Sequence, residues 1–398
     1  METINITRAS ELSEAVKALR RGGLVAVPTE TVYGLCADGL NEQAVADLYE
    51  VKGRPEVKPL SLMVAGRDEM EKYARDIPPA AYTLAELYWP GPLTIVLESR
   101  DVVPSIVRAG GATVGLRCPD HPLTLALLCV VGLPLAGPSA NPSGQPSPKT
   151  ARDVLGYFDG KIDAVVDGGA CGIGRESTII DLTSTPYRIL REGALSREEI
   201  GDALFNGVKL IGLTGGTGTG KTTVLRALEA RGMLGLDCDE IYHELLESST
   251  DMLNELRGLF PTAFSGDKLD RKALGLIVFN DPEALNTLNT VSHRYVRQEV
   301  RRRIEEYAWR GGQRAVIDAI ALFESGLSDW CEPVVGVVAP EEVRMRRIMS
   351  REGISEEYAL TRIQAQHGDE WFRERCGAVI DNGGTLEELQ AQVETLFG

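Results

Sequence analysis

Long apolar runs are missing from this chain of 398 residues. The longest mostly apolar stretch, residues 123–136, is interrupted by Thr124, Gly132 and Pro134, and it falls short of the roughly 20 residues that cross a bilayer. Residues 1–20 lack the basic start and the apolar middle of a secretory signal. We therefore expect no membrane span, no membrane partner and a cytoplasmic location.

Paired cysteines and an excess of positive charge are missing as well. The seven cysteines are scattered and never form a C-x-x-C pair, so the sequence predicts neither a disulfide framework nor a structural zinc site. With 42 basic and 58 acidic residues the net charge is −16, which argues against a chain that coats nucleic acid through an overall positive field. A local basic groove remains compatible with this charge.

What the chain does contain is length enough for two or three domains of about 150 residues each. Short β-rich runs alternate with amphipathic stretches, which predicts an α/β fold with helices packed on a sheet. A helix over residues 196–205 is predicted to begin with a capping box of Ser196 and Glu199. A buried strand over residues 208–213 then starts a new fold. The predicted domains are therefore residues 1–207 and residues 208–398.

A glycine-rich loop follows this strand. Residues 215–222 read G-G-T-G-T-G-K-T, which satisfies G-x-x-x-x-G-K-[ST] ahead of a helical stretch over residues 223–231. The glycines let successive backbone N–H groups wrap around a polyphosphate, Lys221 places a charge on the β/γ oxygens, and the Thr222 hydroxyl can hold Mg²⁺. The residues predicted to bind ATP here are Gly215, Gly216, Gly218, Gly220, Lys221, Thr222 and Thr223.

Two carboxylates follow the next predicted strand, which covers residues 233–236. Asp237 and Asp239 come directly after it, and in this fold class the carboxyl ends of strands face the phosphate crevice. One of them can accept the proton of an attacking hydroxyl or hold the metal through water. The spacing alone leaves both roles open.

Residues 208–398 resemble dephospho-CoA kinase, which transfers a phosphoryl group from ATP to the ribose 3′-hydroxyl of dephospho-coenzyme A. The resemblance implies a C-terminal P-loop kinase domain with a parallel sheet and a helical lid over residues 340–366. The motifs that carry it are L-T-G-G-x-G-x-G-K-T at 213–222, D-x-D at 237–239, L-D-R-x-x-L at 269–274, Val278-Phe279, Leu288-Asn289 and His293.

This resemblance also implies roles for single residues. Asp239 would be the base on the 3′-hydroxyl, Lys221 and Arg347 would act in phosphoryl transfer, and Arg351 would contact the nucleotide from the same helical face as Arg347. Arg271 and His293 would line the coenzyme pocket. The chain departs from the family pattern at Arg294, where proline is usual, and at Ile320-Ala321, where a proline-leucine pair is usual.

The first half carries different motifs. A predicted strand over residues 24–28 leads into T-E-T-V-Y-G-L at 29–35, and K-G-R-P follows at 52–55. Lys52 and Arg54, held in a turn by glycine and proline, make a compact anion site. The loop that begins G-P-S-A-N at residue 137 offers hydroxyl and amide groups for a nucleotide.

Residues 8–195 resemble the YrdC-like family of threonylcarbamoyl-AMP synthases, which condense L-threonine, bicarbonate and ATP. The likeness adds W-P-G-P-L-T, G-L-R-x-P, E-S-T-I-I-D and L-R-x-G-A to the motifs above. It implies a twisted α/β sheet with a positively charged concave face, and it departs at Met63, where histidine is common. The residues implied to contact threonine are Thr31, Arg117 and Ser177, and those implied to hold the nucleotide are Lys52, Arg54, Ser139, Asn141, Ser147 and Arg191.

The sequence therefore predicts a bifunctional enzyme that uses ATP and Mg²⁺, with L-threonine, bicarbonate and dephospho-CoA as substrates and tRNA-modification proteins as possible partners. Two alternatives stay open. The first half could be a non-catalytic RNA-binding module, because a basic concave groove also suits a nucleic acid backbone and could make weak RNA contacts. The second half could be a nucleotide monophosphate kinase, which would differ in its acceptor.

Overall fold

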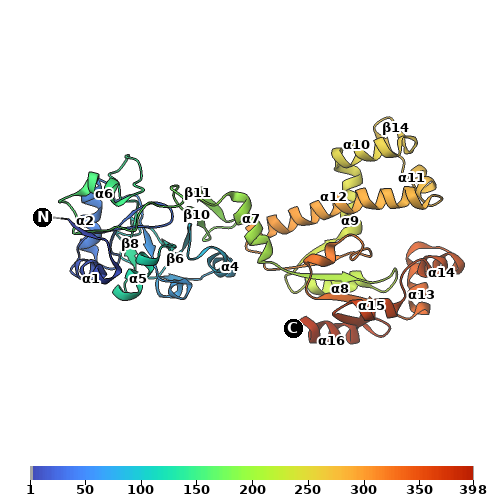
Figure 1. Cartoon of the computed structure of the whole chain (residues 1–398). Coiled ribbons are helices and arrows are strands. Elements are labelled where there is room, and N and C mark those ends of the chain that lie inside the picture. The colour runs from blue at the N-terminus through green and yellow to red at the C-terminus, as the bar shows by residue number, and fades with distance from the viewer. Residues whose placement is uncertain (1–2, 398) are drawn as a thin grey trace. The chain divides into compact units, whose positions relative to one another are not determined.

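The computed structural model describes residues 3–397, which form two compact units (Figure 1). The first contains the chain up to Gly207 together with Trp309–Gly311, and the second contains Val208–Ala308 and the chain from Gly312 onward. Each unit has a sheet and an apolar core of its own, as the α/β pattern predicts. No helix within residues 3–397 is both long enough and apolar enough to cross a membrane.

The first unit is built on one mixed sheet of 11 strands in the order β1-β9-β2-β3-β8-β4-β7-β6-β10-β11, with β5 paired to β6. Its strands are β1 (Ile4–Ile6), β2 (Val25–Val27), β3 (Gly34–Asp38), β4 (Ser61–Met63), β5 (Ala74–Arg75), β6 (Leu93–Ser99), β7 (Thr113–Arg117), β8 (Leu135–Ala136), β9 (Ala164–Val166), β10 (Thr178–Asp181) and β11 (Arg188–Arg191). Its helices are α1 (Leu12–Arg20), α2 (Glu42–Lys52), α3 (Met70–Tyr73), α4 (Pro79–Tyr88), α5 (Pro122–Val131), α6 (Ala151–Phe158) and α7 (Arg197–Asn206).

Helices pack on this sheet through apolar faces that repeat at helical spacing. In α1 the residues Leu12, Ala15, Val16 and Leu19 are buried, and they share one apolar cluster with strand residues of β2 and β9. The strand β2 occupies the centre of the strand predicted over residues 24–28 and is fully buried. This packing fixes the sheet whose loops carry the candidate site.

The helix α7 begins as its sequence predicts. The Ser196 hydroxyl accepts a hydrogen bond from the backbone N–H of Glu199, and the Glu199 carboxylate accepts one from the Ser196 N–H. This reciprocal cap satisfies two donors that a helix N-terminus otherwise leaves unpaired. The side chains of Ile200 and Leu204 are buried, so this face of the helix packs against neighbouring residues.

The second unit is built on five parallel strands in the order β13-β16-β12-β17-β18. Helices α13 and α14, within the predicted lid, pack on each other through Ile348, Ala359 and Ile363. Its strands are β12 (Lys209–Thr214), β13 (Leu234–Asp237), β14 (Phe264–Ser265), β15 (Lys268–Leu269), β16 (Arg314–Asp318), β17 (Val334–Val338) and β18 (Ala378–Asp381). Its helices are α8 (Lys221–Glu229), α9 (Cys238–Ser248), α10 (Thr250–Leu259), α11 (Arg271–Val278), α12 (Pro282–Trp309), α13 (Glu341–Glu352), α14 (Glu356–Gln364), α15 (Asp369–Arg375) and α16 (Leu386–Phe397).

The direction of the chain order across this sheet changes at β12. Strands β13 and β16 lie on one side of β12, and β17 and β18 lie on the other. The connections that leave β12 and its neighbours therefore diverge, and a ligand of such a sheet binds at the carboxyl ends of the strands where this divergence occurs. The loop from β12 to α8 opens at that point.

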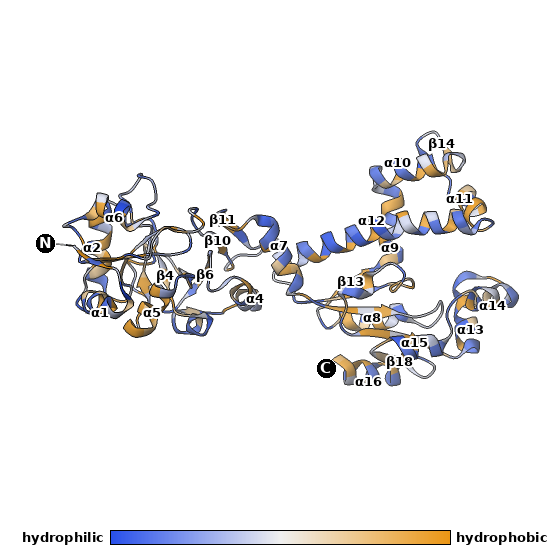
Figure 2. Ribbon diagram, in the orientation of Figure 1, coloured by the Kyte–Doolittle hydropathy of each residue, from blue (hydrophilic) through white to orange (hydrophobic). Residues whose placement is uncertain are grey.

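A group of helices, α9 to α12, stands beside the sheet with its own apolar cluster (Figure 1). The long helix α12 buries Leu288, Val291, Val296, Val300 and Ile304, which recur every three to five residues along one stripe. Figure 2 shows the remainder of α12 as mostly hydrophilic. The buried stripe lets one helix serve both as a wall of this group and as a wall of a cavity.

Candidate active sites

The first unit holds a cavity of about 180 Å³ at one edge of its sheet. Strand β7 ends at Arg117 and is parallel to β4, whereas β6 runs antiparallel to β7 and parallel to β10. The ends of β4 and β7 therefore meet the beginnings of β6 and β10, which brings polar residues from separate motifs together. Five of the predicted site residues line this cavity: Arg54, Ser139, Arg117, Ser177 and Arg191.

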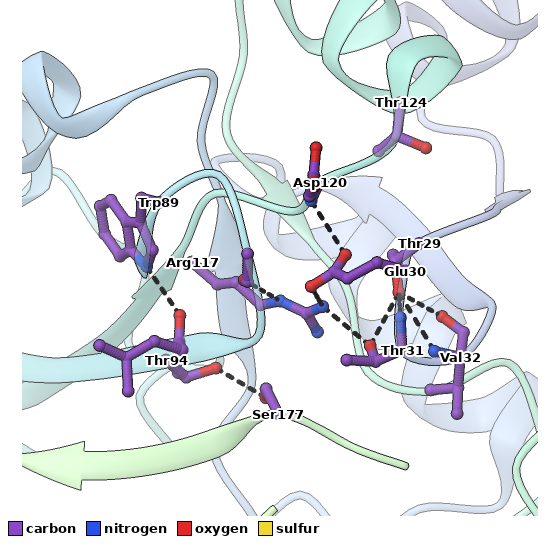
Figure 3. Close-up of polar contacts among 12 residues, drawn as sticks. Thr29, Glu30, Thr31, Val32, Trp89, Thr94, Arg117, Asp120, Thr124 and Ser177 are labelled. Atoms are coloured by element: carbon purple, nitrogen blue, oxygen red, sulfur yellow. Dashed lines mark hydrogen bonds and ion pairs between the residues drawn. The ribbon is translucent and has the colours of Figure 1, made fainter. Parts of the chain in front are cut away.

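A buried ion pair holds Arg117 in place (Figure 3). Its Nη2 donates to the Glu30 carboxylate at 2.6 Å and to the Thr31 hydroxyl at 2.8 Å. The other Glu30 oxygen accepts the backbone N–H of Asp120 at 2.9 Å. The side chains of Arg117 and Glu30 are only 9% and 13% exposed, so the guanidinium stands in a fixed orientation. Thr31 does not line the cavity and reaches it through Arg117.

Ser177 joins the same wall from the beginning of β10. Its hydroxyl lies 3.0 Å from that of Thr94 and accepts a hydrogen bond from Arg191 Nη2 at 3.1 Å (Figure 3 shows the pair of hydroxyls). Arg191 also donates to the Ser177 carbonyl. Two predicted residues from different motifs are thus in direct contact.

Lys52 lies behind the cavity wall. Its ammonium donates to the carbonyls of Ser139 and Asn141, so it secures the loop that carries both residues. The pKa of Lys52 is lowered to about 8, mainly by burial and also by the neighbouring Arg54, while Glu176 opposes the shift. Asn141 is buried behind the wall too, and its Oδ1 has no hydrogen-bond partner within the described part of the chain.

Glu176 links Ser147 to Arg191. Its carboxylate accepts the Ser147 hydroxyl at 2.9 Å and pairs with Arg191 Nη1 at 2.9 Å. Ser147 and Arg191 line a neighbouring cavity of about 350 Å³, and Arg191 and Glu176 line both cavities. Arg54, one residue after the left-handed cap at Gly53, donates to the carbonyls of Lys58 and Pro59.

Met63 replaces the histidine that is common in the family resembled. It is 3% exposed and forms part of the cavity wall. A Cβ on Gly137 would stand 2.8 Å from its terminal methyl carbon, so the thioether fills space that glycine leaves. Met63 makes this part of the cavity wall apolar, whereas a histidine would make it polar.

Replacing Glu30 by glutamine is expected to destabilise the chain by about 3 kcal/mol, because it leaves a buried guanidinium without its counter-charge. Urea unfolding measures the change. The matched control is Glu14→Gln, which removes a carboxylate paired to Lys17 on the surface with 46% and 67% exposure and should cost less than about 0.5 kcal/mol. Equal effects of the two substitutions would contradict a structural role for the buried pair.

In the second unit the loop from β12 to α8 has the shape of a phosphate cradle. Gly215 and Gly220 have φ angles of 146° and 91°, and a Cβ on them would stand 2.2 Å from the Val337 carbonyl oxygen and 2.1 Å from Asn382 Nδ2. Only glycine allows this close approach. Lys221 begins α8 and its ammonium donates to the Gly215 carbonyl at 3.0 Å. Thr222 and Thr223 are exposed on the first turn of α8.

Three carboxylates lie at the ends of β13 and β16 or directly after them. Asp237 ends β13 and caps α9 by accepting the N–H groups of Asp239 and Glu240. Partial removal of water and the neighbouring Asp237 raise the pKa of Asp239, while Lys221 and His243 oppose the shift. Asp318 ends β16 and its Oδ1 is buried without a hydrogen-bond partner among residues 3–397.

The two lid arginines have different surroundings. Arg347 Nη1 lies 3.3 Å from the Thr219 carbonyl oxygen of the P-loop, whereas Arg351 pairs with Glu352 and is 61% exposed. Arg344, one turn before Arg347 on α13, is buried and donates to the Thr217 carbonyl at 3.0 Å. The structure thus brings Arg347 to the loop, adds Arg344, and leaves Arg351 at the surface.

In the second unit, a cavity of about 290 Å³ adjoins Asp239. Asp239 and His293 both line it, as do Ile320 and Ala321. Burial lowers the pKa of His293, and Glu324 opposes this. Arg271 does not line the cavity, because its guanidinium contacts His243 at 3.4 Å and Glu247 at 3.2 Å.

Two protein families match the chain in sequence. The Sua5, YciO and YrdC family, described as "Telomere recombination", matches residues 17–193, and the dephospho-CoA kinase family matches residues 209–388. A structure of Pyrococcus abyssi Sua5 complexed with L-threonine is 27% identical, with a TM-score of 0.50 over 89% of this chain and 98% of that one.

Curated relatives divide in the same way. A threonylcarbamoyl-AMP synthase of Pyrococcus abyssi is 49% identical over 46% of this chain and 54% of its own length, and one of Halorhodospira halophila is 38% identical over 46% of this chain and 95% of its own. A dephospho-CoA kinase of Corynebacterium diphtheriae is 38% identical over 48% of this chain and 96% of its own length. The chain belongs to both families. It spans about half the length of the first three synthase relatives.

The sequence motifs of the two families left several site residues unassigned. In the synthase-family half these are Glu30, inside T-E-T-V-Y-G-L, and Glu176, which begins E-S-T-I-I-D. In the kinase-family half they are Asp318, directly after the apolar run 315–317, and Arg344, one turn before Arg347. Two signals could have found the kinase-half residues. Asp318 is a carboxylate at the end of an apolar strand, and Arg344 is a basic residue three positions before Arg347.

Asp318→Asn in the kinase-family half is expected to stabilise the chain at neutral pH when nucleotide is absent. Burial raises the pKa of Asp318 to about 7, and Lys221 opposes the shift. The folded state therefore holds the Asp318 proton more tightly than the unfolded chain does. The resulting contribution to the free energy of unfolding is complete below the ordinary Asp pKa and is lost as the pH rises to about 7. Removing the charge should add on the order of 2 kcal/mol at pH 8 and little at pH 4.

Thermal unfolding of the nucleotide-free chain across this pH range measures the effect. Asp267→Asn serves as the control. The Asp267 side chain is fully exposed, so this substitution should leave the dependence of stability on pH unchanged. A loss of stability at pH 8 on Asp318→Asn would contradict the raised pKa.

Proposed function

We propose that the chain is a bifunctional enzyme. Its first half forms threonylcarbamoyl-adenylate from L-threonine, bicarbonate and ATP, and its second half phosphorylates the 3′-hydroxyl of dephospho-CoA. The observation that carries this proposal is that each half holds a site of its own, a cavity lined by three arginines in the first half and a glycine loop followed by Lys221 in the second. Each site lies in the part of the chain that matches the corresponding family. The synthase relatives and the Sua5 complex with L-threonine support the first activity, and the kinase relatives support the second.

The first reaction needs positioning and charge compensation rather than a protein nucleophile. The threonine amine takes up the carbon of bicarbonate with loss of water, the resulting carbamate oxygen attacks the α-phosphorus of ATP, and pyrophosphate leaves. Arg117, Arg191 and Arg54 around the cavity supply the cations that offset the negative charge of these groups. Thr31 supplies a hydroxyl oxygen that contacts the Arg117 side chain, and Ser177 supplies one on the cavity wall.

In the second reaction the P-loop supports ATP binding. Its backbone N–H groups and Lys221 suit the β- and γ-phosphates, and Arg347, which contacts the Thr219 carbonyl of the loop, would offset charge on the transferring group. The residues fit Mg²⁺ as well, because the Thr222 hydroxyl is exposed at the loop and Asp318 carries a buried oxygen without a partner in the described chain. When bound there, the ion would screen the phosphate oxygens.

Asp239 is the proposed base. It lies where the 290 Å³ cavity meets the phosphate loop, so an acceptor in that cavity can present its ribose hydroxyl to the carboxylate. The hydroxyl oxygen attacks the γ-phosphorus, its proton passes to Asp239, and ADP leaves. His293 and the Ile320-Ala321 segment form other parts of the acceptor wall.

The product of the first half would pass to proteins that modify adenosine in tRNA, since an activated threonylcarbamoyl group needs an acceptor. The two activities share ATP but no chemical intermediate. Each half is therefore proposed to work through its own site, and substitutions should affect one activity at a time.

Lys221→Ala is expected to abolish dephospho-CoA phosphorylation and to leave threonine-dependent pyrophosphate release intact, because this ammonium serves only the P-loop. Arg54→Ala should do the reverse, reducing synthase activity by roughly 10- to 100-fold through loss of a charged phosphate contact. Both activities are measured on the full chain, so each variant is the control for the other. Parallel loss of both activities in either variant would contradict the two-site proposal.

Asp239→Asn should lower kinase turnover by roughly 10² to 10⁴, the usual contribution of a positioned base, while ATP affinity stays near that of the parent. Asp237→Asn is the matched control, because asparagine caps a helix about as well as aspartate and can still accept the N–H groups at the start of α9. Steady-state kinetics with ATP titrations separate the effects. A larger loss for Asp237→Asn would reassign the base.

The pH profile gives a second readout for the same pair. Since the pKa of Asp239 is raised, kinase activity should fall on the acid side at a pH above the ordinary Asp pKa of 3.8. Asp237→Asn removes a like charge that contributes to this rise and should move the acid limb to lower pH. An acid limb that does not move would show that Asp239 does not titrate in the reaction.

A further inference from the structure

Phe279 is an aromatic side chain in an unusual position. It is 82% exposed, the highest fraction among the large apolar side chains that the structure describes. It lies at the C-terminal cap of α11, where its N–H bonds the Gly275 carbonyl. A Cβ on Gly275 would stand 3.6 Å from ring atom Cε2, so the ring lies over a glycine that leaves it room. A ligand that covered this ring would remove apolar surface from water, which is favourable.

The ring nevertheless lines the cavity that Asp239 adjoins. Apolar side chains form much of this cavity, with Val278, Leu288 and Val296 among them. The cavity therefore combines an apolar wall, an exposed aromatic ring and a carboxylate. Such a combination suits a ligand with a flat apolar part and a hydroxyl a short distance away.

We infer that Phe279 stacks on the purine base of the acceptor and so determines its affinity for the kinase site. This inference rests on the proposed kinase function. When the ribose 3′-hydroxyl reaches Asp239, the adenine on the same sugar must lie within one ribose of the carboxylate. Phe279 belongs to the apolar wall of the same cavity that Asp239 lines, so this wall is where we expect the adenine to lie. Stacking then covers the exposed ring, and it tolerates any purine because every base has a flat face.

Leu276 provides the comparison on the same helix. It is 72% exposed and lies three residues before Phe279, but it does not line the cavity. Leu276 and Phe279 both expose apolar surface at α11. Of the two, only Phe279 is expected to contact the acceptor. Substituting Leu276 controls for any general effect on the helix.

The test compares Phe279→Ala, Phe279→Leu, Phe279→Tyr and Leu276→Ala in the full chain. The KM for dephospho-CoA should rise by about 5- to 150-fold in Phe279→Ala, with the KM for ATP unchanged. Tyrosine should restore most of the affinity and leucine should not, because stacking needs a ring. A KM for Phe279→Ala that matches Leu276→Ala, or a leucine variant as good as the tyrosine one, would overturn the inference.

A binding measurement checks the stacking itself. The ethenoadenine derivative of dephospho-CoA should lose fluorescence when it binds the parent chain, and at saturation it should lose clearly less with Phe279→Ala. Equal quenching in the two proteins would overturn the inference, even if affinity differed. Failure of the proposed function is distinguishable, because the parent chain would then leave dephospho-CoA unphosphorylated under every condition.

Discussion

A strand buried in a sheet has its backbone groups paired along its length, so it can present polar groups to a ligand only at its ends. Both units of this chain obey that constraint. In the first, the ends of β4 and β7 meet the beginnings of β6 and β10, and the cavity with Arg117 and Ser177 opens there. In the second, the P-loop follows β12, and Asp237 and Asp318 are the last residues of the parallel strands β13 and β16. The pairing of the strands within each sheet keeps these strand ends next to one another.

Charge at both sites is held locally rather than by the chain as a whole. The net charge of −16 is unfavourable for anions, yet each site concentrates cations and fixes them with a neighbouring acceptor. Glu30 holds Arg117, Glu176 holds Arg191, and backbone carbonyls hold Lys52 and Lys221. At short range such groups outweigh a distant negative surface, because salt screens interactions beyond about 10 Å.

The sequence predicted those features that depend on neighbours along the chain. The capping box at Ser196, the strand before the P-loop and the loop itself are local patterns with a single physical solution. It could not predict contacts set by tertiary packing. Arg347 and Arg351 share a helical spacing, but only Arg347 reaches the P-loop, and the Asp237 side chain caps α9 because the chain turns helical at Cys238. Glu30 was likewise missed, since its partner Arg117 lies 87 residues away.

The segment between Arg344 and Gln366 is closed into a ring by one residue of the P-loop. Arg344 donates to the Thr217 carbonyl, while the Gln366 side chain accepts the Thr217 N–H at 2.7 Å and donates to its hydroxyl at 2.9 Å. Both ends of the α13–α14 excursion are thus hydrogen-bonded to Thr217. The entropy of closing this ring is lost during folding.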